Sequence, residues 1–352
     1  MTTDRISTRW DAFGALCKTR LLEFFRESEV VFWSFVFPII LSVGLGIAFR
    51  NRPAEASAVV VIESPRAEGV AAALHAAPLV KEVIRSEEEA AQALRLGKAD
   101  LLVYPRGESS LEYRYDPSRP ESVVARSRVD DALQRAAGRK DLVVASDQPV
   151  TQSGGRYIDF LIPGIIGMNL MSGGMWGVGF YLVDMRIKRL LKRLLATPMR
   201  RADFMLATMA VRILSMFVEV TFLLLFGRLA FGLVVRGNYL SIVALGMLGA
   251  LCFGGMGLLV AARARRIEGV MGLMNVVMMP MFVCSGIFFS WERFPVAVQP
   301  VIRLLPLTAL NDALRGLILE GTPLSAQTAR IGVLLLWGGL SFVLGLKFFR
   351  WT

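Results

Sequence analysis

Long apolar runs dominate this sequence, and one of the polar stretches between them is far longer than the others. The first run, Val30–Phe49, carries no charge and is about twenty residues long, enough to cross roughly 30 Å of hydrocarbon as a helix. Five more runs follow, at about Phe160–Val183, Phe204–Val235, Leu240–Ala261, Val270–Ser290 and Ile331–Leu346. The pattern predicts an α-helical polytopic membrane protein with six transmembrane helices.

The long polar stretch, residues 50–156, has the rhythm of an α/β domain inserted after the first span. Apolar runs at 58–62 and 101–104 and an alternating pattern at 111–115 predict strands, whereas 87–96 and 121–137 have helical patterns. The single histidine, His75, lies in an Ala-rich helical stretch without a nearby acid or cysteine. We therefore assign His75 no catalytic role.

Two segments are amphipathic without being apolar enough to cross a membrane. Residues 1–29 have apolar side chains at helical spacing and no cleavable signal, which predicts a helix on the cytoplasmic membrane surface or, alternatively, one packed on a partner. Between the fifth and sixth spans, residues 291–325 are interrupted by Pro295, Pro300 and Pro306. Such a segment favours an external hairpin of short interfacial or re-entrant helices, inside a membrane domain that covers 157–352.

Basic residues beside the spans predict the orientation. On one side of a six-span arrangement the short segments carry about seventeen Lys and Arg, and on the other side about six. Positive charge marks the cytoplasmic side, so both termini should be cytoplasmic and residues 50–156 outside, in a bacterial plasma or inner membrane. The net charge of +11 then reflects topology and contact with membrane lipid, and we expect no nucleic-acid partner.

Composition and motifs limit the kinds of chemistry that we expect of this chain. Apolar residues make up 54% of the chain and charged residues 20%, a balance outside the range of soluble domains. The sequence contains no phosphate-binding loop, since Leu96-Gly97-Lys98 lacks the flanking residues, and it has no hydrolase or metalloprotease motif. Three scattered cysteines support neither a disulfide framework nor a zinc site. We expect no enzyme activity and no directly bound cofactor.

Arg212 and Glu219 lie well inside the third span. Arg212 and Glu219 are seven residues apart, hence about two turns along nearly the same helix face. Charges at this depth are costly, so Glu219 and Arg212 are candidates for a substrate route or a dimer interface, and the alternative is a structural interhelical hydrogen bond. Glycines at Gly173, Gly177 and 254–257 are interpreted as packing sites.

A basic amphipathic segment lies near 185–196, between the second and third spans. Its charged and apolar residues alternate at helical spacing, and the pattern ends at the turn of Thr197-Pro198. Such a helix can transmit force to a docked subunit, or it can serve as a lipid-facing anchor, and the two roles are compatible. The candidate coupling residues are Arg186, Lys188, Arg189, Lys192, Arg193, Leu195 and Pro198.

Several short motifs in order resemble the transmembrane subunits of ABC transporters of the type-2 permease family that have a large external domain. They are Phe160-Leu161-Ile162-Pro163-Gly164, Leu194-Leu195-Ala196-Thr197-Pro198, Ser285-Gly286-Ile287-Phe288-Phe289, Leu305-Pro306-Leu307-Thr308 and Ala313-Leu314-Arg315-Gly316. One departure is that Ser290–Arg293 intervenes before Phe294-Pro295, which leaves the geometry of the external hairpin open.

The resemblance implies one half of an exporter for amphiphiles, lipids, polysaccharide or drugs. It implies a second copy of this chain or a paired permease, and a separate ATPase subunit that binds ATP and Mg and docks on the cytoplasmic helices. A rival interpretation is a membrane-anchored scaffold whose external domain recruits an envelope partner. A membrane transferase would need clustered catalytic acids or histidines, which we do not find in the sequence.

Overall fold

The chain folds into two compact units, each with a hydrophobic core of its own. The computed structural model describes residues 26–49, 56–106, 110–140, 155–190, 201–264 and 266–349, together with Gly14, Lys18, Thr19, Leu21, Leu22 and Arg193. We call residues 1–50 and 151–352 the membrane unit and residues 51–150 the inserted domain. Most of the expected N-terminal amphipathic helix lies outside the described residues.

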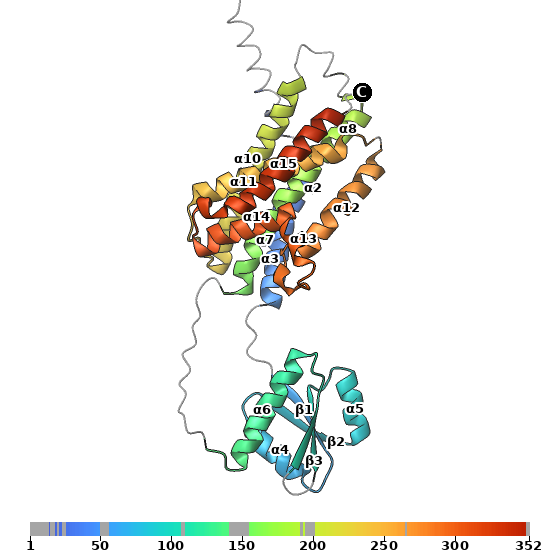
Figure 1. Ribbon diagram of the computed structural model, residues 1–352, viewed down its shortest axis with the longest axis vertical. Coiled ribbons are helices and arrows are strands. Elements are labelled where there is room, and N and C mark those ends of the chain that lie inside the picture. The colour runs from blue at the N-terminus through green and yellow to red at the C-terminus, as the bar shows by residue number, and fades with distance from the viewer. Residues whose placement is uncertain are drawn as a thin grey trace, which may run out of the picture. The chain divides into compact units, whose positions relative to one another are not determined.

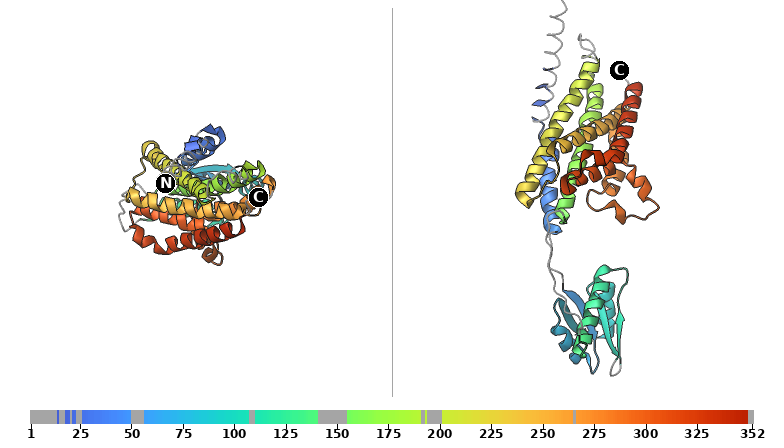
Figure 2. Two further views of the ribbon diagram at one scale, coloured as in Figure 1. Left: turned by 90° about the horizontal axis from the view of Figure 1, so that it is seen from above. Right: turned by 60° about the vertical axis from the view of Figure 1, so that its left-hand side comes forward.

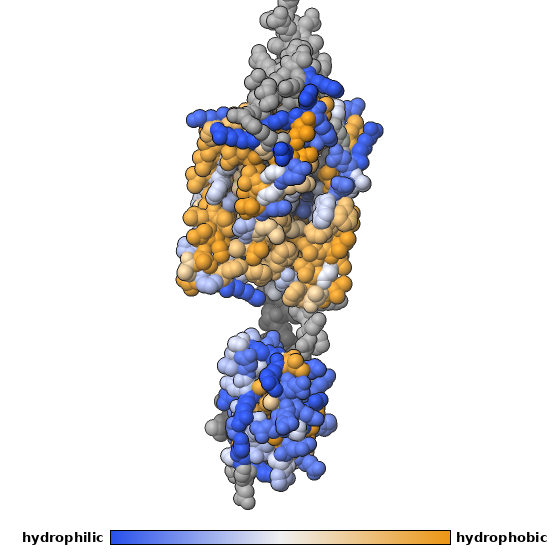
Figure 3. Space-filling view, turned by 90° about the vertical axis from the view of Figure 1, so that its right-hand side faces the viewer, coloured by the Kyte–Doolittle hydropathy of each residue, from blue (hydrophilic) through white to orange (hydrophobic). Residues whose placement is uncertain are grey.

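Among the described residues, six helices of the membrane unit are long and apolar enough to cross a membrane, which confirms the predicted fold class (Figure 1). On the face of this unit seen in Figure 3, a broad apolar band lies between polar residues at the two ends. The candidate spans are Ser28–Ala48, Tyr157–Ile187, Phe204–Phe231, Tyr239–Ala261, Ile267–Cys284 and Leu324–Phe348. They comprise α2 (Ser28–Val31), η1 (Phe32–Val36) and α3 (Phe37–Ala48); α7 (Tyr157–Gly174), η2 (Met175–Phe180) and α8 (Tyr181–Ile187); α10 (Arg201–Phe231); α11 (Tyr239–Ala261); α12 (Ile267–Cys284); and α15 (Thr328–Phe348).

Glycines bring the second and fourth spans into backbone contact. A Cβ added to Gly257 of α11 would lie 2.7 Å from the carbonyl oxygen of Gly174 in α7, and one added to Gly174 would lie 2.8 Å from the amide nitrogen of Gly254. No side chain fits between backbones that close, so glycine is required on both helices. These contacts place α7 and α11 at the centre of the bundle, with α15 packed along α11.

Two spans end earlier than their hydropathy suggests. We expected the third to reach Val235 and the fifth Ser290, but α10 ends at Phe231 and α12 at Cys284. Gly232 and Gly286 have left-handed backbones, with φ of 65° and 72°, and the Gly232 amide donates to the carbonyl of Arg228 at 3.0 Å. This αL geometry terminates a helix even when apolar residues continue beyond it.

The segment between the fifth and sixth spans forms short helices, but one of them is not at an interface. It contains η3 (Trp291–Arg293), α13 (Gln299–Arg303), α14 (Pro306–Arg315) and η4 (Gly316–Glu320), and η5 (Leu324–Gln327) then begins the sixth candidate span. In α14 nearly every residue is buried, and the helix packs against α7 and α15 (Figure 2). This burial argues against an interfacial position for α14, and the re-entrant alternative stays a prediction.

The inserted domain is a four-stranded mixed sheet with helices on both faces. Its strand order is β2 (Val80–Arg85), β1 (Ser57–Ile62), β3 (Leu101–Arg106) and β4 (Ser110–Arg114), with β4 antiparallel to β3 and the other pairs parallel. Helices α4 (Ala67–His75) and α6 (Pro120–Ala136) cover one face, and α5 (Glu87–Arg95) the other. The sequence pattern missed β2, a largely exposed edge strand with charged residues at three of its six positions.

Candidate functional site

Three arginines hold the second span at three depths of the membrane unit. We name the two ends of the unit by the residues at which this span begins and stops, the Tyr157 end and the Ile187 end. Arg315 contacts the span at the Tyr157 end, Arg212 in its middle, and Arg186 belongs to the span at the Ile187 end. Each guanidinium donates to at least one backbone carbonyl of a neighbouring segment.

In the middle of the unit, Arg212 and Glu219 of α10 form a buried ion pair. The Arg212 Nη1 lies 2.9 Å from Glu219 Oε1 and its Nη2 lies 3.3 Å from Oε2. Their side chains are only 6% and 2% exposed. The seven-residue spacing brings both groups to one face of the helix, and the two-point contact neutralises charge that would otherwise be costly at this depth.

The ion pair is tied to two other spans. Arg212 Nη2 donates to the carbonyl of Asn169 in α7 at 3.4 Å, and the Asn169 amide donates to the carbonyl of Ser34 in η1 at 2.9 Å. A Cβ on Gly173 would lie 2.3 Å from the guanidinium, so glycine provides the space for Arg212. The π-helical turn at η1 breaks the usual hydrogen-bond pattern of the first span beside this contact.

This placement bears directly on the two roles predicted for Arg212 and Glu219. Both side chains lie between α10 and α7, inside one copy of the chain, and not on its outer surface. The geometry is that of a structural link between spans one, two and three. A substrate route through the pair would require these helices to separate.

At the Ile187 end, Arg186 holds the C-terminus of another span. Its Nη1 donates to the carbonyls of Ala261 and Ala264 at 3.1 and 2.8 Å, just where α11 stops, and its guanidinium lies 4.7 Å from the centre of the Phe349 ring. A cation at a helix C-terminus binds carbonyls that have no partner within the helix and opposes the negative end of the helix dipole. Arg186 therefore connects the ends of the second, fourth and sixth spans.

The remaining coupling candidates divide into those that the structure describes and those that it does not. Helix α8 ends at Ile187, and Arg189 has a left-handed backbone with φ of 57°, so the expected single helix from residue 185 is interrupted by a turn at Lys188 and Arg189. Lys188 pairs with Asp184 at 2.8 Å. Arg193 is described and exposed, whereas Lys192, Leu195 and Pro198 lie outside the described residues.

At the Tyr157 end, Arg315 joins three segments. It is 9% exposed and ends α14. Its Nε and Nη2 each donate to the carbonyl of Phe160 at 3.4 Å, Nη2 also contacts the Gly286 carbonyl, and Nη1 lies 3.5 Å from Asp312. The guanidinium lies over the Phe160 ring, 3.6 Å from its centre.

Sequence reasoning did not single out this cluster, although its motifs were visible. Phe160–Gly164, Ser285–Phe289 and Ala313–Gly316 resemble family motifs separately, and the structure brings one residue of each to the same guanidinium. A Cβ on Gly164 would lie 2.7 Å from the Ile287 carbonyl oxygen and 3.2 Å from Arg315 Nη2. The available signal was an arginine inside an otherwise apolar, glycine-flanked segment.

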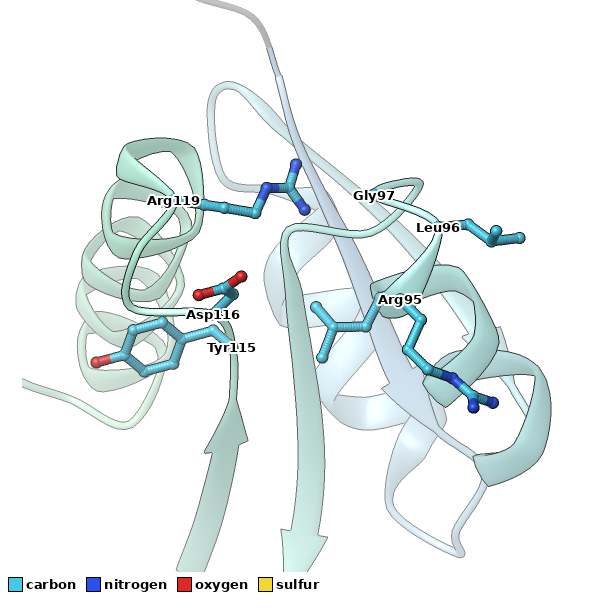
Figure 4. Close-up of a pocket in the computed structure, with 7 residues that line it drawn as sticks. Arg95, Leu96, Gly97, Tyr115, Asp116 and Arg119 are labelled. Carbon is cyan, nitrogen blue, oxygen red and sulfur yellow. The ribbon is translucent and has the colours of Figure 1, made fainter.

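The inserted domain has a cleft, but its charges are already partnered. A cavity of about 490 Å³ lies between the end of α5 and the start of α6 (Figure 4). Arg119 lies 3.6 Å from Asp100, and two hydrogen bonds from Ser118 lower the pKa of Asp116, while Arg95 points away from the cleft in Figure 4. We assign no ligand to this cleft. Among the described residues, no cluster of His, Cys, Asp or Glu could hold a metal ion.

Comparison with known proteins places the chain. Residues 29–347 match the family model described as ABC-2 family transporter protein. The match covers the inserted domain and all six candidate spans except Ser28 and Phe348. ABC transporter G family member 20 of Dictyostelium discoideum is 26% identical over 191 residues, which are 54% of this chain and 26% of that protein. The aligned residues therefore span about a quarter of the relative's length.

Proposed function

This chain belongs to the ABC-2 transporter family, and from that premise we propose that it is the permease subunit of an ATP-driven exporter. Membership of this family makes it a transmembrane subunit of an ABC transporter, and the ATPase in this proposal is a separate protein. The proposed substrate is amphiphilic: a lipid, a polysaccharide or a drug-like molecule moved out of the cytoplasm or the inner leaflet. The observation that supports this most strongly is the family match over nearly the whole membrane unit.

The proposed orientation places the Ile187 end in the cytoplasm of a bacterial cell and the inserted domain outside. Basic residues gather where α8 ends and α12 begins, and they include Arg186, Lys188, Arg189, Arg193, Arg263 and Arg266. Positive charge beside spans favours the cytoplasmic side. With the native cysteines replaced, a thiol probe at Q134C in α6 should react with an impermeant reagent in intact cells, and one at E268C in α12 should not.

Arg189 and Arg193 are the proposed contacts with the ATPase. Arg186 and Lys188 are bound within the chain, so they support the coupling segment more than they extend from it. Arg189 follows the end of α8 at a turn, where a docked subunit could push on the second span. Lys192, Leu195 and Pro198 complete the segment on sequence evidence.

A second copy of this chain is the proposed permease partner, and α12 is the proposed contact. Only one stripe of α12 is buried, namely Val270, Met274, Met278 and Met281. Asn275, near the middle of this span, is exposed, and a Cβ at Gly269 or Gly272 would meet no atom within 4 Å. A polar side chain facing lipid is unfavourable, whereas small residues allow close helix approach, so this face suits another helix.

Co-purification tests the proposal. The full-length protein in mild detergent should retain one ATPase, identified by mass spectrometry, and R189E/R193E should weaken its binding or uncouple its hydrolysis. The matched control is R263E/R266E, which makes the same charge change at the same end but in another loop. Insertion is checked with the thiol probes at 134 and 268, because these charges also orient the protein.

The outcomes separate the alternatives. Unchanged ATPase affinity and turnover in R189E/R193E would show that the coupling assignment is wrong. Recovery of an envelope protein on the inserted domain, with no ATPase bound, would favour the scaffold function instead.

A further inference from the structure

The Arg315 cluster contains a charge that is only partly neutralised. Among the described residues, the carboxylate that pairs with the guanidinium is that of Asp312, at 3.5 Å, and the other acceptors are the Phe160 and Gly286 carbonyls. Burying a charge on such acceptors is costly unless the geometry engages most of its donors. The planar fork of arginine presents donors on separate nitrogens to acceptors from two segments, whereas a lysine ammonium would have to reach both from a single nitrogen.

The same residue fixes the end of α12. Gly286 follows that helix by two residues and accepts from Arg315, while the Asn311 amide donates to the carbonyl of Ser285 at 2.8 Å. Both donors come from α14, one turn apart. The Tyr157 end of α12 is therefore attached to α14 through the backbone carbonyls of Ser285 and Gly286. These hydrogen bonds can break and form again without a rearrangement of the α12 side chains.

The loop after α12 is also connected to Arg315, through Trp291 and Asp312. Asp312, which lies beside Arg315, accepts from the Trp291 indole nitrogen at 3.0 Å, and Arg303 lies over the Trp291 ring at 4.6 Å. Contacts thus continue from Phe160 through Arg315 and Asp312 to the loop after α12. Movement of this loop away from α7 has to break them.

The junction leaves several polar atoms unpaired. The Oγ of Ser285, the Oγ1 of Thr308 and the Oδ1 of Asn311 are buried without a hydrogen-bond partner among the described residues. Contacts between described residues therefore leave part of the hydrogen-bonding capacity of this junction unused.

We infer that Arg315 is a positioning residue that latches the Tyr157 end of α12, and the loop after α12 that contains Trp291, against the second span. We infer also that this latch releases during transport. The inference rests on the proposed exporter function only for the release. The attachment itself is independent of any ATPase.

A native thiol reports on the latch. Cys284 is the last residue of α12, two positions before Gly286, and is partly buried. In full-length protein with Cys17 and Cys252 replaced, R315A should raise the rate of Cys284 alkylation about tenfold, the scale expected for loss of a charge-assisted hydrogen bond. R315K and D312N should give smaller increases, and they serve if R315A does not assemble.

Two matched variants control for other effects. R293A removes an exposed arginine of the loop after α12, and R212M/E219L removes a buried arginine together with the carboxylate that pairs with it; neither should change the rate more than about twofold, since neither contacts the latch. Equal rates in R315A, R315K and the parent would overturn the attachment, as would an equal rise in R212M/E219L.

The release is tested in the complex with the co-purified ATPase. A non-hydrolysable ATP analogue should change the Cys284 rate in the parent protein but not in R315A, where the latch is already open. If the nucleotide leaves the Cys284 alkylation rate of the parent protein unchanged in a complex that hydrolyses ATP, the release is wrong. Arg315 would then have a structural role alone. Failure to recover any ATPase would count against the proposed function, while the rates without nucleotide would still decide the attachment.

Discussion

Arg212 and Arg315 are both buried and both contact the second span, but they are neutralised in different ways. Arg212 has its carboxylate on its own helix, two turns away, and forms a two-point ion pair with it. Arg315 depends mainly on carbonyls from two other segments. The first arrangement is complete once α10 is helical, whereas the second exists only when the bundle has packed. One is a property of a helix and the other a property of the tertiary structure.

The largest expected effect comes from removing one member of the ion pair. E219L leaves Arg212 buried without its carboxylate, which should destabilise the protein by about 3–5 kcal/mol, whereas R212M/E219L should recover most of that loss. Thermal stability of detergent-solubilised protein, followed by size-exclusion fluorescence, measures both. Failure of the double variant to recover would contradict the description of the pair as self-contained.

The conservative variant E219Q separates structure from transport. Normal assembly with impaired transport per complex would support a substrate route at Glu219. Equal transport would leave the pair with its structural role alone.

The corresponding pair at the Tyr157 end should respond differently. R315M should cost about 1.5–3 kcal/mol through loss of charge-assisted hydrogen bonds. R315M/D312L should not be rescued, because the Phe160 and Gly286 carbonyls still lose their donor. The same thermal assay applies, and recovery in this double variant would erase the contrast with Arg212.

Glycine substitutions sharpen the comparison along the second span. G164A brings a Cβ to 2.7 Å from the Ile287 carbonyl and should destabilise by about 1–3 kcal/mol. G177A is the matched control in the same span, because a Cβ there meets no atom within 4 Å. Alanine is the better helix former by about 1 kcal/mol, so G177A should be neutral or stabilising in the thermal assay. A destabilised G177A would show that glycine matters there for another reason.

The smallest effect is expected for an exposed charge cluster of the inserted domain. Hydrogen bonds from Arg114 and Arg106 lower the pKa of Glu112, so its contribution to stability is present above the usual glutamate pKa and is lost as the pH falls through the lowered value. Because the group is solvent-exposed, E112Q should change the thermal midpoint at neutral pH only marginally, and the two proteins should converge in acid. A large difference at neutral pH would contradict this ranking.

Patterns with a strong physical period were readable from the sequence. Hydropathy gave the six spans, and the spacing of Arg212 and Glu219 placed them on one face, where the structure joins them. Most strands and helices of the inserted domain were predicted near their observed bounds. Helix ends were less readable, because Gly232 and Gly286 stop helices through backbone conformation within runs that remain apolar.

Other features depend on contacts between distant residues. Nothing local indicates that Arg186 binds the carbonyls at the end of α11, 75 residues away, instead of extending toward a partner. Arg315 meets the Phe160 carbonyl across 155 residues, and α14 packs closely on α7 because Gly164 and Gly167 leave room for its side chains. Periodicity within a segment carries no information about such pairings.

The hydrogen bond from Asn169 to the carbonyl of Ser34 has a consequence for biogenesis. Its two residues are separated by the inserted domain of about 100 residues, residues 51–150. A ribosome adding roughly 5–20 residues per second needs about 5–20 s to synthesise that domain. During this time the first span, which is largely unburied even in the finished bundle, has to wait beside the translocon or in lipid without its partner. Its own apolar length, and not its contacts, must therefore keep the nascent chain anchored until the second span emerges.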